Sequence, residues 1–281
     1  MLQIGRQYPS DLSDQQWEVI RDLIPRARAG GRPRTTDLRR VINAVFYLSR
    51  SGCAWRYLPK DFPPWQTVYE YFSSWKAQGV WRKIHHVLRA SARIRAGRHE
   101  VPSCLIVDSQ SVKAPRGQDR AYDGFKRVRG RKRHILVDTL GFVHAVKVHA
   151  ADRPDQREGH RLFSQIPKSW DSRIKCLLAD QGYRGDFEEE TDIRFGFLPS
   201  ITRRENTGQG RKKTTAEKIA WRKSKTRLLF PKRWIVERTF AWFNHYRRLT
   251  KDYEAKPSTS ECMIQVAMTQ LMVRRLARRT Q

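Results

Sequence analysis

Apolar side chains recur three or four residues apart through the first hundred positions, which is the spacing of amphipathic helices. Ser13, with Gln16 three residues later, forms a capping box that predicts the start of the first helix. Thr36 is expected to cap the second helix, and Gly52 to end it. The pattern therefore predicts an all-α domain within residues 1–100.

Two of these helices, joined by a turn and flanked by basic residues, are compatible with a helix-turn-helix DNA reader. In that interpretation Gln66 and Thr67 face a DNA groove, while Arg32 and Arg34 follow the phosphate backbone. A plain helical bundle that packs on its aromatic residues explains the same pattern. The sequence leaves both interpretations open.

Short apolar runs replace the helical pattern after residue 101. Their alternation with helical stretches predicts an α/β domain within residues 101–281. The predicted strands lie at residues 104–107, 131–138, 142–148, 174–179 and 194–201, with helices at 156–163 and 231–248.

The charge of the chain indicates its partner. There are 57 Lys and Arg against 28 Asp and Glu, a formal net charge of +29. A chain this basic is expected to bind a polyanion. The acidic residues are most numerous between residues 101 and 200, where a ribosomal or histone-like protein has little use for them and a metal-dependent nuclease needs them.

Two sequence features bear on the location of the protein. The four cysteines lie too far apart for a zinc finger or ribbon, so we expect reduced thiols in a cytoplasmic protein. No stretch approaches the ~20 apolar residues of a membrane span, so no membrane partner is expected.

Three acids are candidates for a metal site. Asp108 and Asp180 each follow an apolar strand, so their carboxylates would share a cation if the strands are neighbours. Glu237 on the last predicted helix would supply a third ligand, with Arg233 one turn before it. Each acid alone is more often a turn former, a cap or a surface ion-pair partner. Together, in a basic chain, they favour the metal site.

A dense basic run precedes and enters the second predicted strand. We expect it to line a DNA channel, although a solvated hairpin explains it too. The residues concerned are Lys126, Arg127, Arg131, Lys132 and Arg133.

Several stretches resemble bacterial insertion-sequence transposases of the insertion-sequence-five family, within the insertion-sequence-four-like superfamily. The resemblance covers nearly the whole chain. It is carried by LIVDSQSVK (105–113), GRKRHILVDTLG (130–141), LLADQGYRG (177–185) and RWIVERTFAWFNHYRRL (233–249), and in the N-terminal part by residues 8–25 and 52–59.

The resemblance implies a ribonuclease-H-like catalytic domain, a five-stranded mixed sheet with flanking helices. It implies that Asp108, Asp180 and Glu237 are the catalytic acids. Two Mg²⁺ ions, for which Mn²⁺ can substitute, would serve the transfer of phosphoryl groups. The expected partner is double-stranded DNA, both at the ends of the element and at the target site. The protein is expected to bind it as a homodimer or higher oligomer at the bacterial nucleoid.

The superfamily signature runs Tyr, Arg, Glu, Lys at fixed spacing. Here Arg233 and Glu237 match, whereas Phe230 stands in the tyrosine place and Asn244 in the lysine place. Arg233 and Asn244 are the expected DNA contacts on this helix. A nuclease or resolvase that cuts without joining, and an architectural DNA-binding protein, are the alternative functions.

Overall fold

Local capping sets the first helices of the protein. The computed structural model describes residues 8–26, 34–201 and 232–278. Helix α1 (Asp14–Ile20) begins at the predicted capping box of Ser13 and Gln16 and continues into a 3-10 turn, η1 (Arg21–Leu23). In α2 (Leu38–Ser51) the cap is Asp37, whose side chain accepts from two backbone N–H groups, and not the predicted Thr36.

Glycines with positive φ separate the helices that follow. Gly52 (φ 75°) ends α2 as predicted, and Gly79 (φ 70°) precedes α4. The remaining N-terminal elements are η2 (Trp55–Tyr57), α3 (Trp65–Ala77) and α4 (Val80–Arg95). All predicted N-terminal helices are thus present.

A mixed sheet of six strands follows, which confirms the predicted α/β class. β3 pairs antiparallel with β1 and β4, while β5 pairs parallel with β1 and β6. The short β2 pairs antiparallel with the start of β3 and is an addition to the five strands expected. The strands are β1 (Cys104–Lys113), β2 (Ala121–Asp123), β3 (Val128–Asp138), β4 (Val143–Ala150), β5 (Cys176–Ala179) and β6 (Ser200–Ile201).

Two strand boundaries differ from the expectation. β1 continues through Asp108 to Lys113 because its pairing with β3 extends to Gly130. The residues from Arg194 belong first to the end of a helix, so β6 holds only the last two residues of the strand predicted there. The connecting elements are α5 (Asp155–Gly159), η3 (His160–Gln165), η4 (Lys168–Trp170), η5 (Gln181–Tyr183) and α6 (Asp186–Phe195).

The last predicted helix is divided. Within the described residues it consists of α8 (Trp234–Phe243) and α9 (Arg247–Thr250), because Tyr246 adopts an extended conformation and buries its ring. Pro231, expected to open this helix, lies outside the described residues. A further helix, α10 (Pro257–Leu276), follows.

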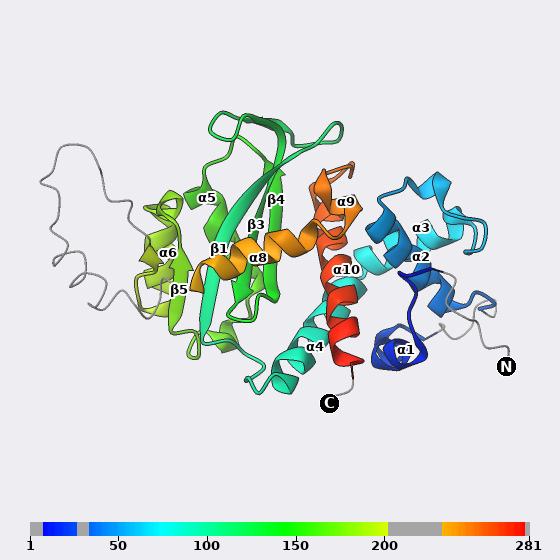
Figure 1. Cartoon of the computed structure of the whole chain (residues 1–281). Helices are drawn as coiled ribbons and strands as arrows, with labels where there is room; N and C mark the ends of the chain where they lie inside the picture. The colour runs from blue at the N-terminus through cyan, green and yellow to red at the C-terminus, as the bar shows by residue number, and fades with distance from the viewer. Residues whose placement is uncertain (1–7, 27–33, 202–231, 279–281) are drawn as a thin grey trace, which may run out of the picture.

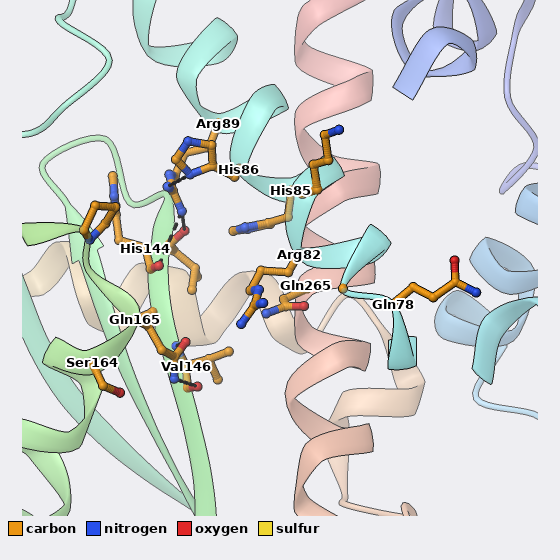
Figure 2. A pocket seen from close by; sticks show the side chains of 15 residues that line it. Gln78, Arg82, His85, His86, Arg89, His144, Val146, Ser164, Gln165 and Gln265 are labelled. Atoms are coloured by element: carbon orange, nitrogen blue, oxygen red, sulfur yellow. Dashed lines mark hydrogen bonds between the residues drawn. The ribbon is translucent and has the colours of Figure 1, made fainter. Parts of the chain in front are cut away.

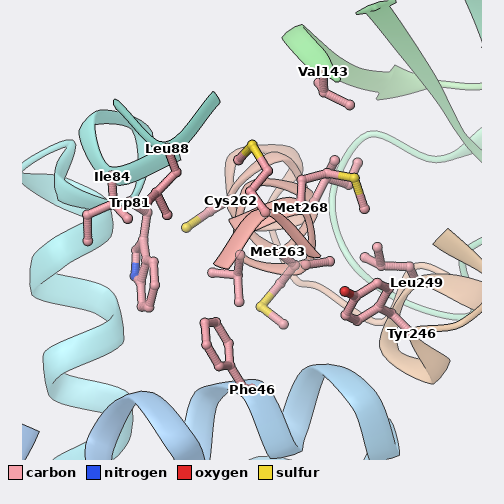
Figure 3. Packing of buried hydrophobic residues seen from close by; sticks show 14 of the residues in the cluster. Phe46, Trp81, Ile84, Leu88, Val143, Tyr246, Leu249, Cys262, Met263 and Met268 are labelled. Atoms are coloured by element: carbon pink, nitrogen blue, oxygen red, sulfur yellow. The ribbon is translucent and has the colours of Figure 1, made fainter. Parts of the chain in front are cut away.

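Helix α10 joins the two parts of the molecule. It stands between α1, α2 and α3 on one side and the sheet on the other, with α4 beside it, while α8 crosses one face of the sheet (Figure 1). One apolar cluster contains Phe46 of α2, Trp81 of α4, Met263 of α10 and Val143 of β4 (Figure 3). The division at residue 100 therefore stays a prediction about function, since both parts share this core. No helix in the described ranges is long and apolar enough to cross a membrane.

Candidate active site

Strand pairing places the two predicted aspartates side by side. The parallel register pairs Ile106 of β1 with Leu178 of β5. Two residues further along each strand come Asp108, within β1, and Asp180, directly after β5 ends. Because the offset between the strands is constant, both carboxylates lie at the same edge of the sheet. Asp180 also accepts from the Gly182 N–H at 2.9 Å.

Helix α8 brings the third predicted acid to this edge. It packs across β1 and β3, with Glu237 in its first turn. Arg233 lies between two of the acids, with Nη2 3.0 Å from Glu237 Oε1 and Nη1 3.8 Å from Asp108 Oδ2. The structure thus gathers Asp108, Asp180, Glu237 and Arg233 around one point of the sheet.

The pKa of Asp108 is shifted by its surroundings. Burial raises its pKa to about 7, and the negative charges of Asp180 and Glu237 act in the same direction. The Ser109 N–H and Arg233 act against this shift but do not cancel it. A nearby positive charge would favour the ionised form of Asp108.

The donor set fits a hard divalent cation. Carboxylate oxygens are the ligands that Mg²⁺ and Mn²⁺ accept, and the charge of such a cation is of the right sign. In the part of the chain that the structure describes, no three such side chains converge closely enough to hold an ion as they stand. Arg233 makes ion pairs with two of the three acids.

A second carboxylate network adjoins the three acids and was not foreseen. Asp155, at the start of α5, accepts from Ser109 Oγ at 3.2 Å and pairs with Lys132 Nζ at 2.9 Å. A Cβ placed on Gly182 would lie 3.1 Å from Asp180 Oδ1 and 3.3 Å from Asp155 Oδ2, so the two carboxylates are close neighbours. The signal available was a further acid shortly after a strand, in the segment that follows β4.

The buried Tyr183 underlies this network. Its hydroxyl lies 2.9 Å from His134 Nδ1, and its ring is fully enclosed. Burial raises the pKa of Tyr183, and the charges of Asp108, Asp155 and Asp180 raise it further. Tyr183 is therefore a neutral hydroxyl beneath the acids.

The basic run on β3 divides into internal and external residues. Arg131 is buried and pairs with Asp252 at 3.1 Å, and Arg133 is buried and donates to the Leu249 carbonyl at 2.7 Å. Neither side chain can line a DNA channel, which corrects the expectation for both. Lys132 is also buried and faces Asp155.

Two of the remaining basic candidates stay exposed. Lys126 and Arg127 lie in the hairpin before β3, and contact with DNA remains a prediction for them. In the N-terminal part, Gln66 is exposed and Thr67 half-buried at the start of α3.

The other predicted DNA contacts differ in their surroundings. Arg34 folds back on its own chain and donates to the Pro25 carbonyl at 3.0 Å. Asn244 is exposed just beyond α8. Arg32 and Phe230 lie outside the described residues.

Comparisons with known proteins bear on both parts of the chain. The family model "Transposase DDE domain" matches residues 99–272, and "Putative transposase of IS4/5 family" matches residues 12–85. Uncharacterized protein y4sN of Sinorhizobium fredii is 31% identical over 103 residues, 37% of this chain and 76% of that protein. The insertion element IS402 uncharacterized 16.2 kDa protein of Burkholderia cepacia is 28% identical over 110 residues, 37% and 73% respectively. No solved structure matches the chain.

Proposed function

Because the chain belongs to the transposases with a DDE domain, of the IS4/IS5 family and with a ribonuclease-H-like catalytic fold, we propose that Asp108, Asp180 and Glu237 are its catalytic acids. We propose further that it cleaves DNA at the ends of an insertion sequence and joins the freed ends to target DNA. The observation that carries the proposal is the meeting of β1, β5 and the first turn of α8 at one sheet edge.

The chemistry requires a nucleophile to approach a negatively charged phosphodiester. Divalent ions, when bound, activate the attacking oxygen and stabilise the leaving one. In cleavage a water oxygen attacks phosphorus and the 3′-oxygen leaves as a hydroxyl. In joining that hydroxyl attacks a target phosphodiester and displaces the target's own 3′-oxygen. One set of carboxylates serves both steps because only the nucleophile changes.

The residues around the acids have separate tasks in this proposal. Asp108, Asp180 and Glu237 would hold the divalent ions. Arg233 orients Glu237 and can donate to a phosphate beside the reacting group. Asp155, which is paired with Lys132, would hold Ser109 in position. Ser109 directly follows Asp108 on β1, so this contact would also position Asp108.

The test is a strand-transfer assay with uncut and pre-cleaved end DNA. Asp108→Asn, Asp180→Asn and Glu237→Gln should each reduce cleavage and joining by at least about a thousandfold and leave DNA affinity nearly unchanged, since the basic surface supplies the affinity. Asp192→Asn, an exposed acid on α6, is the matched control. Omitting Mg²⁺ should stop both reactions, and Mn²⁺ should restore them.

Particular results would contradict the proposal. Activity near wild type in Glu237→Gln would move the third acid elsewhere. The next acids to consider would be Glu254 and Glu217. Glu254 is engaged with Arg248 at 2.7 Å, and Glu217 lies outside the described residues. Cleavage without joining of pre-cleaved ends would identify a nuclease, and binding without metal-dependent cleavage would identify an architectural protein.

A further inference from the structure

A basic cavity lies beside β4, which is separated by β3 from the strand that carries Asp108. It encloses about 380 Å³ between α4, the outer edge of β4, η3 and α10 (Figure 2). β3 separates β4 from β1, so the cavity is not part of the candidate active site. Among the described residues that line it, none is an Asp or a Glu. The cationic and imidazole groups that line it are Arg82, Lys83, His85, His86, Arg89 and His144.

The N-terminus of a long helix opens onto this cavity. Helix α4 has 16 residues, and Gly79 at its start lines the cavity. Within the described part of the chain no side chain caps this helix end, and its first turn holds no acid. Arg82 and Lys83 instead stand near its start, where the helix dipole already presents positive charge. This arrangement is unfavourable for the protein alone and favourable once an anion is present.

A buried imidazole supplies a second, independent observation. His85 is only 4% exposed, and its Nε2 has no hydrogen-bond partner among the residues that the structure describes. Figure 2 shows His85 and Arg82 extending from α4 toward the side of the cavity where Val146 and Gln165 lie. A buried polar atom without a partner costs free energy unless a ligand meets it.

Arg89 adds a buried positive charge to the wall. It is 4% exposed and donates to the carbonyl groups of Val143 at 3.1 Å and His144 at 3.4 Å. Its guanidinium also lies 2.9 Å from His86 Nδ1 and stacks over Trp170. Among the described carboxylates, none forms an ion pair with it. The cavity thus combines buried and exposed cations with an uncapped helix end.

We propose that this cavity binds a phosphate group of the DNA backbone, away from the reacting phosphodiester. The inference rests on the proposed action on DNA. Arg82 and Lys83 would neutralise the phosphate, the first N–H groups of α4 would donate to its oxygens, and His85 Nε2 would donate from within. Because neighbouring strands lie ~4.8 Å apart, the phosphate is held at least two strand spacings from Asp108. It therefore orients the duplex and takes no part in the chemical step.

The first experiment measures DNA affinity without divalent ions, in EDTA, over a range of salt concentrations. Arg82→Gln/Lys83→Gln alters two exposed side chains, so the fold should persist. We expect about a tenfold loss of DNA affinity. The slope of log affinity against log salt concentration should become shallower by the amount that corresponds to about one phosphate contact. Lys60→Gln/Arg98→Gln removes the same charge at exposed positions outside the cavity and should lose less than about twofold. Equal losses in both double variants would overturn the proposal.

The second experiment separates DNA from free phosphate. Inorganic phosphate, titrated by calorimetry, should bind the wild-type protein and not the Arg82→Gln/Lys83→Gln variant, and duplex DNA should displace it. Phosphate binding that DNA does not displace would make the cavity a free-phosphate site and overturn the proposal. No phosphate binding in the wild type would overturn it as well.

Failure of this inference can be told from failure of the proposed function. The wild-type protein is assayed for Mg²⁺-dependent cleavage and joining alongside the binding measurements. Suppose that the wild-type protein cleaves DNA, but the cavity variant binds DNA as tightly as the control variant. This result would overturn only the proposal about the cavity. A cavity that binds DNA phosphate in a protein that neither cleaves nor joins would overturn the proposed function alone.

Discussion

Arg233 is the residue whose contacts most directly link the candidate acids. Its guanidinium lies against Glu237 and near Asp108. We predict that Arg233→Ala lowers single-turnover cleavage roughly ten- to hundredfold, the effect of about 1.5–3 kcal/mol for a charge-assisted contact, while DNA affinity changes little. Arg233→Lys should not restore the rate, since an ammonium group cannot span both contacts. Parallel cleavage and filter-binding measurements check this, and equal losses in the two would make Arg233 an ordinary binding residue.

Asn244 tests the alignment of the superfamily signature. It is exposed directly after α8, where a positive charge is favourable to the helix dipole. We predict that Asn244→Lys keeps cleavage within about twofold of wild type, because lysine adds a phosphate contact without burying its charge. The same single-turnover assay measures it. An inactive Asn244→Lys protein would show that position 244 does not correspond to the signature lysine.

Single residues could be foreseen where the signal was local. Asp108 and Asp180 follow apolar runs that the sequence makes plain, and the register of β1 and β5 explains why they meet. Asp155 was missed although it follows a strand closely, because its place beside Asp180 depends on how α5 packs against the sheet. Arg131 resembled a surface residue by its basic neighbours, but its carboxylate partner, Asp252, lies far along the chain.

At the scale of elements, the junction between α2 and α9 depends on Gly52. It has φ 75°, and a Cβ there would lie 2.9 Å from Arg247 Cβ. Gly97 has φ 67° and open space around it, so it is a matched control. We predict that Gly97→Ala lowers the free energy of unfolding by about 1 kcal/mol and Gly52→Ala by about 1–3 kcal/mol more. Urea denaturation measures the difference, and equal effects would mean that α9 shifts without cost.

Elements were predictable from the sequence where their ends are marked locally. The capping box of α1 and the glycines around α2 and α4 fall into this group. Helix α10 was missed because it is buried around most of its circumference, including Thr269 and Gln270, and so shows no apolar stripe. The end of β1 was missed because its partner strand decides it.

At the scale of the whole molecule, the shared apolar cluster predicts one unfolding transition. α10 packs on α1, α2, α4 and β4, so neither the N-terminal helices nor the sheet keeps its core alone. Hydrogen exchange in α2 and in β3 should report the same free energy of unfolding, and Met263→Ala should lower both by about 2–5 kcal/mol. Two separate transitions would mean that the parts fold independently.

Acid should destabilise the whole fold through buried groups near Arg93. Burial lowers the pKa of His144 to about 3, so this imidazole stays neutral in the folded protein. Burial alone would raise the pKa of Asp138, but the hydrogen bond from His144 and the charge of Arg93 lower it to about 2. Both groups bind protons more readily in the unfolded protein, so the free energy of unfolding falls as the pH falls. The contribution of His144 is lost below about pH 6.5 and that of Asp138 below about pH 4.

The variant His144→Gln isolates the histidine contribution. Glutamine can still donate to Asp138 but does not titrate, so between pH 6 and 4 the decline in the free energy of unfolding should lessen by about 1.4 kcal/mol per pH unit. His99→Gln, at an exposed position, is the control. Denaturation curves at several pH values measure the slopes. Identical slopes in wild type and His144→Gln would show that His144 is charged in the folded protein.

The position of α10 also has a consequence for biosynthesis. The ribosome releases α2 and α4 first, and the helix that covers their apolar faces only after the whole sheet. At ordinary rates of translation this delay is on the order of ten seconds. During that time the nascent chain exposes a surface that chaperones recognise. An mRNA truncated before the α10 codons would yield a protein that contains Asp108, Asp180 and Glu237. It would lack the helix that completes the N-terminal hydrophobic core.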